Sequence, residues 1–483
     1  MNAPVRKVAI AAMVLFALLI LNVNYIQVVR ANALRKDEGN TRQLYQEYDR
    51  ERGSITVAGN PIAASQATDG ALKYLRTYPD GPTYAPVTGW YSLVSGTTGL
   101  EQVENDVLSG SDPRLTFRRL ADLFTGRDPA GGNVELTLDP NVQKTAMDGL
   151  LALDGMTGAV VALDPETGAV LGLASAPTFD PNQLSSHEPA KIREYRKSLT
   201  NQQLLNHAID DRYSPGSVFK VVVSAAALST GDYTAQTAVP APDLYTPPGT
   251  SKGIQNYNGE TCNGGGDQPL LEALEMSCNT AFAQLGVTLG EDKVRDMAEA
   301  FGIDDEKSEI PLEVNGSTLG DIPDQPALAQ SSIGQRDVQL TPLQAAMIAA
   351  TVANKGTQMK PYLVKSIQAP DLTTIDQTDP EELGNPISEQ VAAQLDDMMT
   401  AVVTGPRGTG KKAAIPGVKV AGKTGTAQTD PDAKDNSWFV GYADKDGRKI
   451  AVAVFIKGGG TGGDKSAPLA KQVMQAYLSG QGD

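Results

Sequence analysis

The chain has 483 residues, of which 40% are hydrophobic, and it carries a formal net charge of -16 at pH 7. A chain of this length exceeds what one compact core usually organises, so we expect two or three domains. The acidic balance argues against nucleic acid as a partner, because nucleic-acid-binding proteins present basic surfaces, and the hydrophobic content excludes a disordered chain.

An uncharged, strongly apolar stretch covers residues 8–29. As a helix it would extend about 33 Å, which is enough to cross a bilayer. Ala31-Asn32-Ala33 also fits the cleavage pattern of a signal peptide, but the stretch is long for a signal sequence and Arg30 directly adjoins that site. We therefore expect a cytoplasmic tail at residues 1–7, an uncleaved transmembrane anchor at 8–29, and a remainder that lies outside the cytoplasm.

Residues 30–133 are polar, rich in turn residues and poor in long periodic helices, which predicts a small irregular module with short strands. From residue 134 the pattern changes. A short strand precedes a helix that Asp139 and Pro140 would open as N-cap and first-turn residue. Gly158–Ser175 forms two apolar runs around a turn, which indicates a β-hairpin.

A second group of strands lies near the C-terminus, at Val418–Gln428, Ser437–Ala443 and Lys449–Lys457, and the sequence between the two groups is largely helical. Strands from both ends that flank a helical middle favour one α+β domain with a mostly antiparallel sheet, over residues 134–483.

The two cysteines, Cys262 and Cys278, are either buried thiols or a disulfide. We expect the disulfide, because the chain is placed in an oxidising compartment, and a loop of this size would contribute about 3 kcal/mol. Together with His187 and His207 the cysteines show no spacing typical of metal ligands, so no metal and no cofactor are predicted.

Lys220 stands inside an apolar run, three residues after Ser217, in an S-x-x-K pattern. Ser214 and Pro215 resemble a helix start, which would put Ser217 in the first turn, where free N–H groups favour a developing negative charge. Residues three apart share a helix face, so Lys220 would lie beneath the hydroxyl. Burial would lower the pKa of Lys220 and let it accept the serine proton. This pattern alone is weak evidence, because a chain of this length is expected to contain it by chance.

Two further short patterns could complete a site. Ser277-Cys278-Asn279 follows a helical stretch, and its hydroxyl could relay protons while its amide holds a peptide. Lys423-Thr424-Gly425-Thr426 ends an alternating strand, and its cation and hydroxyls could bind a carboxylate, with Gly425 admitting a substrate backbone. Individually these are a common turn and a common strand edge.

Each pattern occurs once, in the order S-x-x-K, S-x-N, K-T-G, and this set is typical of penicillin-binding proteins and class A β-lactamases. The chain resembles the class B penicillin-binding proteins, monofunctional D,D-transpeptidases of peptidoglycan synthesis, and most of all the actinobacterial penicillin-binding protein A group. Further stretches carry the resemblance, namely Arg52–Ile55, Gly99–Glu101, Gly158–Asn182 and Gly334–Ala346.

The resemblance implies a serine β-lactamase/transpeptidase-like domain, an antiparallel sheet with helices on both faces plus an all-helical part, at residues 134–483. A pedestal, or dimerisation-like, domain at 30–133 and the membrane anchor would precede it. The protein would lie in the plasma membrane with its catalytic domain extracytoplasmic. Its partners would be stem peptides ending in D-Ala-D-Ala, β-lactams and the membrane. Cell-division or elongation proteins and a glycosyltransferase are further candidate partners that the resemblance does not decide.

Carried over by motif, the resemblance implies Ser217 as the acylated nucleophile, Lys220 as its base and Ser277 as the proton relay. Asn279 would hold the peptide, and Lys423 would supply electrostatics and contact Ser277. Thr424, Gly425 and Thr426 would bind the donor, whose terminal carboxylate would contact the two threonines. The backbone N–H groups of Ser217 and Thr426 would form the oxyanion hole.

Three alternatives remain at this point. A D,D-carboxypeptidase or β-lactamase would share the fold and hydrolyse the acyl-enzyme. A weakly catalytic scaffold or sensor would keep the pocket and bind β-lactams. A Cys–His nucleophile built on Cys278 has no support beyond the presence of His187 and His207.

Overall fold

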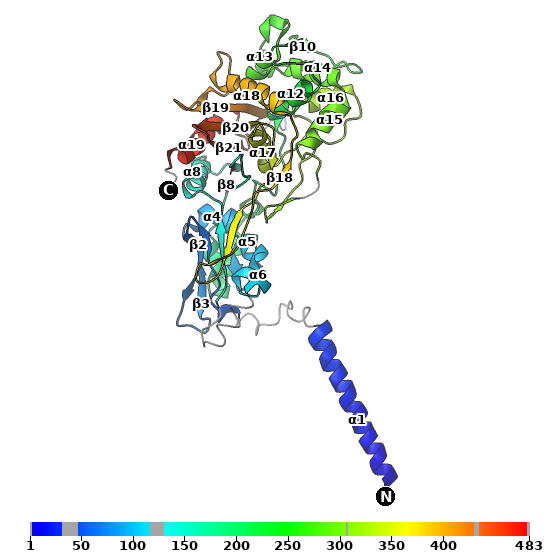
Figure 1. The fold of residues 1–483 in the computed structure, drawn as a ribbon, viewed down its shortest axis with the longest axis vertical. Coiled ribbons are helices and arrows are strands. Elements are labelled where there is room, and N and C mark those ends of the chain that lie inside the picture. The colour runs from blue at the N-terminus through cyan, green and yellow to red at the C-terminus, as the bar shows by residue number, and fades with distance from the viewer. Residues whose placement is uncertain (1, 31–46, 116–129, 306–307, 429–433, 481–483) are drawn as a thin grey trace.

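The computed structural model describes residues 2–30, 47–115, 130–305, 308–428 and 434–480 (Figure 1). Its first helix, α1 (Asn2–Asn24), continues through a π-helical turn, η1 (Tyr25–Val29). The segment Pro4–Gln27 contains an 18-residue window with a mean hydropathy of 2.3 and is long and apolar enough to cross a membrane. This helix fits the anchor that the sequence predicts.

A six-stranded sheet, the pedestal sheet, has the strand order β17-β16-β6-β1-β2-β3, with β1 and β6 parallel and all other neighbours antiparallel. Its strands are β1 (Ile55–Val57), β2 (Asn60–Ala67), β3 (Tyr74–Thr77), β6 (Asn133–Leu136), β16 (Val364–Gln368) and β17 (Thr374–Gln377). Beside it lie α4 (Gly81–Thr88), α5 (Gly99–Val103), α6 (Asn105–Leu108), β4 (Tyr91–Ser92), β5 (Gly96–Thr97) and η2 (Pro113–Leu115).

The pedestal sheet draws on two distant parts of the chain. The domain boundary expected between residues 133 and 134 falls inside β6, which pairs with β1 on one side and with β16 on the other. In the register, Ile367 lies opposite Val134. The module expected at residues 30–133 therefore completes its sheet with strands from later in the chain, and its segments 31–46 and 116–129 lie outside the described residues.

A buried ion cluster joins the two pedestal motifs of the sequence. The Glu101 carboxylate accepts hydrogen bonds at 2.6 Å from the Nε atoms of both Arg52 and Arg76, and at 3.2 Å from the Tyr78 hydroxyl. Burial favours the neutral form of Glu101, but the two guanidinium groups hold its pKa below the ordinary value. Arg76 also donates to the carbonyl of Gly53 at 2.7 Å. The cluster therefore fixes the start of β1 to α5 and β3.

The second sheet is antiparallel throughout, in the order β19-β20-β21-β7-β8. Its strands are β7 (Gly158–Leu163), β8 (Val170–Ala176), β19 (Lys419–Ala427), β20 (Asn436–Lys445) and β21 (Arg448–Ile456). The hairpin and the C-terminal strand group predicted from the sequence are its two halves, and they join where β21 pairs with β7.

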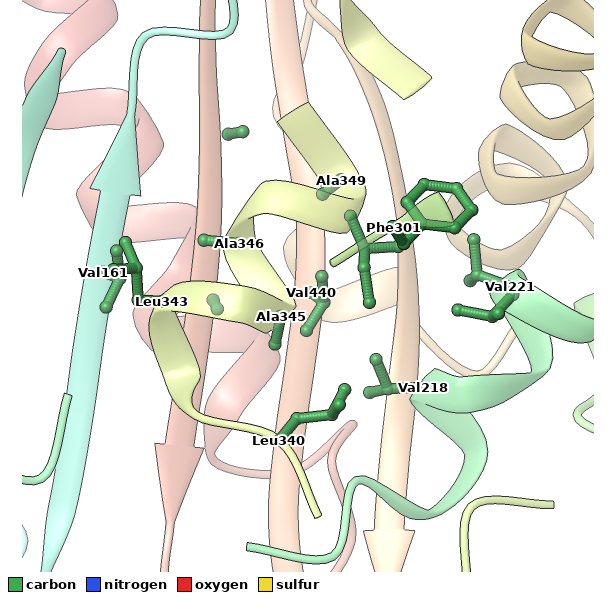
Figure 2. Close-up of a cluster of buried hydrophobic side chains, with 14 of the residues drawn as sticks. Val161, Val218, Val221, Phe301, Leu340, Leu343, Ala345, Ala346, Ala349 and Val440 are labelled. Carbon is green, nitrogen blue, oxygen red and sulfur yellow. The ribbon is translucent and has the colours of Figure 1, made fainter. Parts of the chain in front are cut away.

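Both faces of this sheet are covered, which explains why its central strands are apolar along their whole length. Along β21, Val452 and Val454 pack into one core with α8 (Pro140–Leu151) and α19 (Ser466–Ser479). Ala453 and Phe455 pack into the other core, on the side of α17 (Pro342–Ala353). Figure 2 shows Leu343 and Ala346 of α17 beside Val161 of β7 and Val440 of β20.

The remaining helices form a largely helical part that packs around α12. They are α12 (Lys220–Ser229), α13 (Leu270–Glu275), α14 (Asn279–Leu289), α15 (Glu291–Ala300), α16 (Gln325–Ser331) and α18 (Glu389–Thr404), with α9 (Pro181–Ser185), α10 (Pro189–Ser198) and α11 (Asn201–Leu204) nearer the pedestal. The fold class predicted from the sequence is confirmed.

Short elements connect these helices. The strands are β9 (Ala238–Val239), β10 (Leu244–Tyr245), β11 (Ile254–Gln255), β12 (Gln268–Pro269), β13 (Ser308–Glu309), β14 (Glu313–Val314), β15 (Gln358–Met359) and β18 (Glu382–Gly384). The 3₁₀ turns are η3 (Gly216–Phe219), η4 (Tyr257–Gly259), η5 (Asn263–Gly265) and η6 (Lys411–Ala413).

We predict that Glu101→Ala destabilises the pedestal sheet by about 3–5 kcal/mol, because it leaves Arg52 and Arg76 as buried charges without their counter-ion. Chemical denaturation of the full chain, followed by tryptophan fluorescence, measures the loss. As a control, Asp148→Asn removes the exposed pair with Lys144, which water screens, and should leave the unfolding free energy nearly unchanged. Equal effects of the two substitutions would contradict the prediction.

Candidate functional site

The three sequence motifs meet at one cleft of ≈ 1290 Å³. Ser217, Ser277, Asn279, Thr424 and Thr426 all line it. The two motif lysines lie beneath these residues with no exposed surface. The cleft therefore combines a lining of half-buried and buried hydroxyls with a fully buried pair of amines.

Ser217 is carried by η3, a 3₁₀ turn that leads directly into α12 at Lys220. The helix start expected at Ser214 is not a side-chain cap, since the Ser214 hydroxyl donates instead to the carbonyl of Gly334 at 2.7 Å. Gly216 has a φ of +51°, a region that favours glycine, and a Cβ atom there would collide with the carbonyl of Thr426. This close approach sets the seryl turn against the K-T-G strand.

Lys220 points into the S-x-N turn. Its Nζ donates to the carbonyl of Ser277 at 2.7 Å, to Asn279 Oδ1 at 2.7 Å, and to Ser277 Oγ at the longer distance of 3.3 Å. Within the part of the chain that the structure describes, no hydrogen bond joins it to Ser217. Burial lowers the pKa of Lys220 well below its ordinary value, and repulsion by Lys423 lowers it further.

Lys423 approaches the same turn from β19. Its Nζ donates to Ser277 Oγ at 2.8 Å and to the carbonyl of Thr424 at 2.9 Å. Burial lowers the pKa of Lys423 to about 7. The Ser277 hydroxyl thus lies between two buried amines and accepts its shorter hydrogen bond from Lys423, so that its own proton stays available to another group.

The S-x-N turn is a helix C-terminus followed at once by a helix start. Ser277 has a φ of +65°, unusual for a residue with a side chain, and the N–H groups of Ser277 and Cys278 bond back to the carbonyls of Leu274 and Ala273. This pattern is a Schellman motif with serine where glycine is usual. Asn279 then begins α14. The strained backbone directs Ser277 and Asn279 to the same side of the turn.

The K-T-G strand contributes in two ways. Thr424 Oγ1 lies 2.6 Å from the hydroxyl of Thr409, a residue that no local sequence pattern marked. Gly425 packs where a Cβ atom would meet the carbonyl of Pro215 and the side chain of Trp438. The absence of a side chain at Gly425 therefore lets β19 lie against the seryl segment.

The cysteines form a disulfide, Cys262–Cys278, as expected. This pairing removes the alternative of a Cys–His nucleophile. His207 is also occupied elsewhere, with Nδ1 at 2.7 Å from the Tyr213 hydroxyl. His187 contacts the carbonyl of Tyr74 in the pedestal.

Comparison with known families gives two matches. The family described as penicillin binding protein transpeptidase domain matches residues 158–475. The family described as penicillin binding protein A dimerisation domain matches residues 52–134. The first match spans the cleft and the sheet beside it, and the second spans most of the described pedestal.

Similar proteins are known in mycobacteria. The peptidoglycan D,D-transpeptidase PbpA of Mycolicibacterium smegmatis is 47% identical, with 99% of both chains covered, and that of Mycobacterium tuberculosis is 45% identical, with 100% of both covered. The solved structure of penicillin-binding protein A from M. tuberculosis as a ceftriaxone acyl-enzyme complex superposes with a TM-score of 0.86 at 44% identity, over 90% of this chain and 100% of that one.

The buried amine of Lys423 predicts a pH-dependent stability. Because its pKa is about 7 in the folded chain and near the ordinary 10.5 when unfolded, the unfolded chain binds more protons between these values and wild-type stability rises with pH. We predict that Lys423→Met is most stabilised relative to wild type near pH 7 and that the difference shrinks towards pH 10. Denaturation of both proteins at several pH values measures this difference. A stability difference between Lys423→Met and wild type that grows as the pH rises would contradict the prediction.

Proposed function

The chain belongs to the class B penicillin-binding proteins and is a peptidoglycan D,D-transpeptidase, and we propose that Ser217 is the residue that it acylates. The observation that carries this proposal is the meeting of Ser217, Ser277 and two buried lysines at one cleft. A nucleophilic hydroxyl needs a neutral base, and burial lowers the pKa of Lys220 in the direction that favours its neutral form.

In the first step the Oγ of Ser217 attacks the carbonyl of the penultimate D-alanine of a donor stem peptide. The neutral Lys220 amine donates its two N–H groups to the carbonyl of Ser277 and to Asn279 Oδ1, which leaves its lone pair free for the Ser217 proton. The C–N bond to the terminal D-alanine breaks, and that amine leaves with a proton passed through the Ser277 hydroxyl.

The charge that develops on the attacked oxygen is accepted by the backbone N–H groups of Ser217 and Thr426. The closeness of Gly216 to the Thr426 carbonyl supports this pairing, because it brings the two segments together. The hydroxyls of Thr424 and Thr426 and the Lys423 charge bind the donor's terminal carboxylate, and Thr409 orients Thr424. Asn279 holds the donor peptide. In the second step an acceptor amine attacks the ester, and Ser217 regains its proton.

β-Lactams acylate Ser217 as mimics of the donor. The similar protein of M. tuberculosis forms acyl-enzyme complexes with ceftriaxone and with penicillin G, which supports covalent inhibition of this chain. A weakly catalytic scaffold or sensor is a weaker alternative, because the chain retains both buried amines and the hydroxyl between them.

The protein is anchored in the plasma membrane by α1, with its catalytic domain outside the cytoplasm. The disulfide supports this orientation, since such bonds persist in oxidising compartments. In this arrangement residues 1–7 are a cytoplasmic tail, residues 30–133 form most of the pedestal, which β6, β16 and β17 complete, and the rest of residues 134–483 is the catalytic domain. The pedestal is the surface for proteins of division or elongation, including a glycosyltransferase.

We predict that Ser217→Ala lowers covalent labelling by a fluorescent penicillin by about 10³-fold or more, because no other hydroxyl can replace the nucleophile. Labelled bands on a denaturing gel measure the effect. Ser214→Ala is the matched control, as this nearby hydroxyl bonds to a backbone carbonyl and should leave labelling unchanged. Persistent labelling of Ser217→Ala would remove the assignment.

We predict that release of D-alanine from a peptide ending in D-Ala-D-Ala is accompanied by a cross-linked product when an amine acceptor is present. Mass spectrometry of the products, with and without acceptor, separates transfer from hydrolysis. Release that is purely hydrolytic and insensitive to the acceptor would instead identify a D,D-carboxypeptidase. Stoichiometric penicillin labelling without any release would favour the scaffold.

A further inference from the structure

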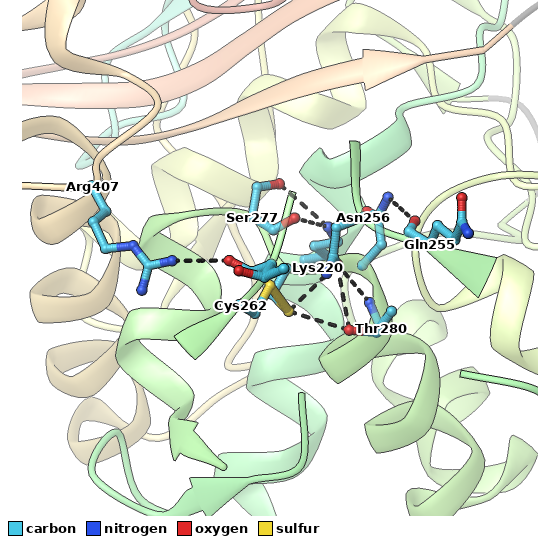
Figure 3. The surroundings of a disulfide bond; sticks show 10 residues. Lys220, Gln255, Asn256, Cys262, Ser277, Thr280 and Arg407 are labelled. Carbon is cyan, nitrogen blue, oxygen red and sulfur yellow. Dashed lines mark hydrogen bonds between the residues drawn. A yellow bond between two sulfur atoms is a disulfide. The ribbon is translucent and has the colours of Figure 1, made fainter. Parts of the chain in front are cut away.

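Residues 255–262, which we name the clamp segment, hold the S-x-N turn through contacts separate from those of Lys220. The carbonyl of Gln255 accepts from Asn279 Nδ2 at 3.1 Å, and Cys262 is bonded to Cys278 (Figure 3). Between these two contacts, Asn256 Oδ1 accepts from the backbone N–H of Thr280 at 3.1 Å. Three consecutive residues of the turn region are therefore tied to one segment.

Asn256 replaces a missing helix cap. Helix α14 begins at Asn279, and its N-cap residue, Cys278, makes no side-chain cap bond because its sulfur is in the disulfide. Asn256 supplies the acceptor from elsewhere in the chain, at the second residue of the helix, where free N–H groups need partners. It is 7% exposed, so water cannot readily take its place.

The environment of the Asn256 amide nitrogen indicates that the side-chain oxygen is the atom with the structural role. Among the described residues this Nδ2 is buried and has no hydrogen-bond partner. An unpaired buried donor is unfavourable, so an apolar side chain would suit the packing better unless the contact to Thr280 were needed. At Asn256, one buried N–H group without a partner thus accompanies the Oδ1 acceptor that binds Thr280.

Among the described residues, every hydrogen-bond acceptor of Lys220 belongs to the turn that Asn256 holds. These acceptors are the carbonyl and hydroxyl of Ser277 and the side-chain oxygen of Asn279. A shift of the turn would therefore move the Lys220 amine and separate the Ser277 hydroxyl from Lys423. The clamp segment itself is supported by Arg407, which donates to the carbonyl of Thr261 at 3.3 Å.

We propose that Asn256, together with the Cys262–Cys278 disulfide, is a positioning residue that holds the S-x-N turn in the geometry required for acylation of Ser217. The inference rests on the proposed function of Ser217. Asn256 acts through Thr280 and the turn, so its loss should slow the acylation step and leave the initial, non-covalent binding of the β-lactam nearly unchanged.

Stopped-flow acylation of the full chain by a fluorescent penicillin separates the non-covalent dissociation constant from the first-order acylation rate. We expect Asn256→Ala to lower that rate by about tenfold to a hundredfold, the size of effect that a small misplacement of a catalytic group produces. Asn256→Gln, which keeps the amide but displaces it, should also be slow. Asn256→Asp should restore most of the rate, because a carboxylate oxygen is a good acceptor at a helix N-terminus.

The matched control is Asp139→Ala, which removes a helix cap of the same kind from α8, away from the cleft. It should lower the melting temperature about as much as Asn256→Ala and leave the acylation rate unchanged. A wild-type rate in Asn256→Ala and Asn256→Gln would overturn the inference. So would a loss confined to the dissociation constant, or an equal slowing in Asp139→Ala.

Reduction of the disulfide gives a second arm. Wild type treated with dithiothreitol should acylate more slowly, and reduction should add little to Asn256→Ala, since both changes release the same turn. Fully additive losses would overturn the shared role. A failure of the proposed function would give a different result. If Ser217→Ala were still labelled by penicillin, Ser217 would not be the nucleophile, whatever the acylation rates of the Asn256 variants.

Discussion

The burial of two lysine head groups around one serine hydroxyl is the constraint on which the catalytic domain depends. Two ammonium ions cannot share a dry site, so desolvation and mutual repulsion together press Lys220 towards its neutral form. The arrangement needs acceptors for each remaining N–H group, and the turn at Ser277 provides most of them. A site that stores a neutral amine in this way needs no histidine to accept a serine proton.

The surrounding fold fixes the three pieces against each other through backbone contacts more than through long side chains. The Trp438 Nε1 of β20 donates to the carbonyl of Ser214 at 3.0 Å, which ties the seryl segment to the sheet. Glycines at 216 and 425 let that segment and β19 approach more closely than any larger residue would allow. Small residues at these positions are therefore as necessary to the geometry as the hydroxyls are to the chemistry.

Local patterns were sufficient to predict the hairpin of β7 and β8, the cap of α8 by Asp139, and the three motifs of the cleft. These features depend on residues close together in the chain. The pedestal sheet could not be predicted in full, because β16 and β17 join it from about 230 residues downstream of β6, a pairing that no periodicity encodes.

For the same reason, local sequence patterns did not predict the roles of Thr409 and Asn256. Each lies in a loop, carries a common polar side chain, and acquires its role only from a partner brought near by the fold. The Ser214 cap was predicted wrongly, since the carbonyl of Gly334, which takes its hydroxyl, is distant in sequence.

The pedestal and the catalytic domain are joined by the paired strands β6 and β16 and by the packing of α4 against β8, where Asn206 Nδ2 also donates to the carbonyl of Pro86. β6 runs antiparallel to β16 at the junction, where the N–H of Thr137 donates to the carbonyl of Leu363 and its hydroxyl donates to that of Val170. A single covalent connection would let the catalytic domain rotate about its own axis, whereas a hydrogen-bonded strand pair with packed helices beside it resists such rotation. Torque applied to the pedestal would thus be transmitted to the catalytic domain, and the mouth of the cleft would turn with it.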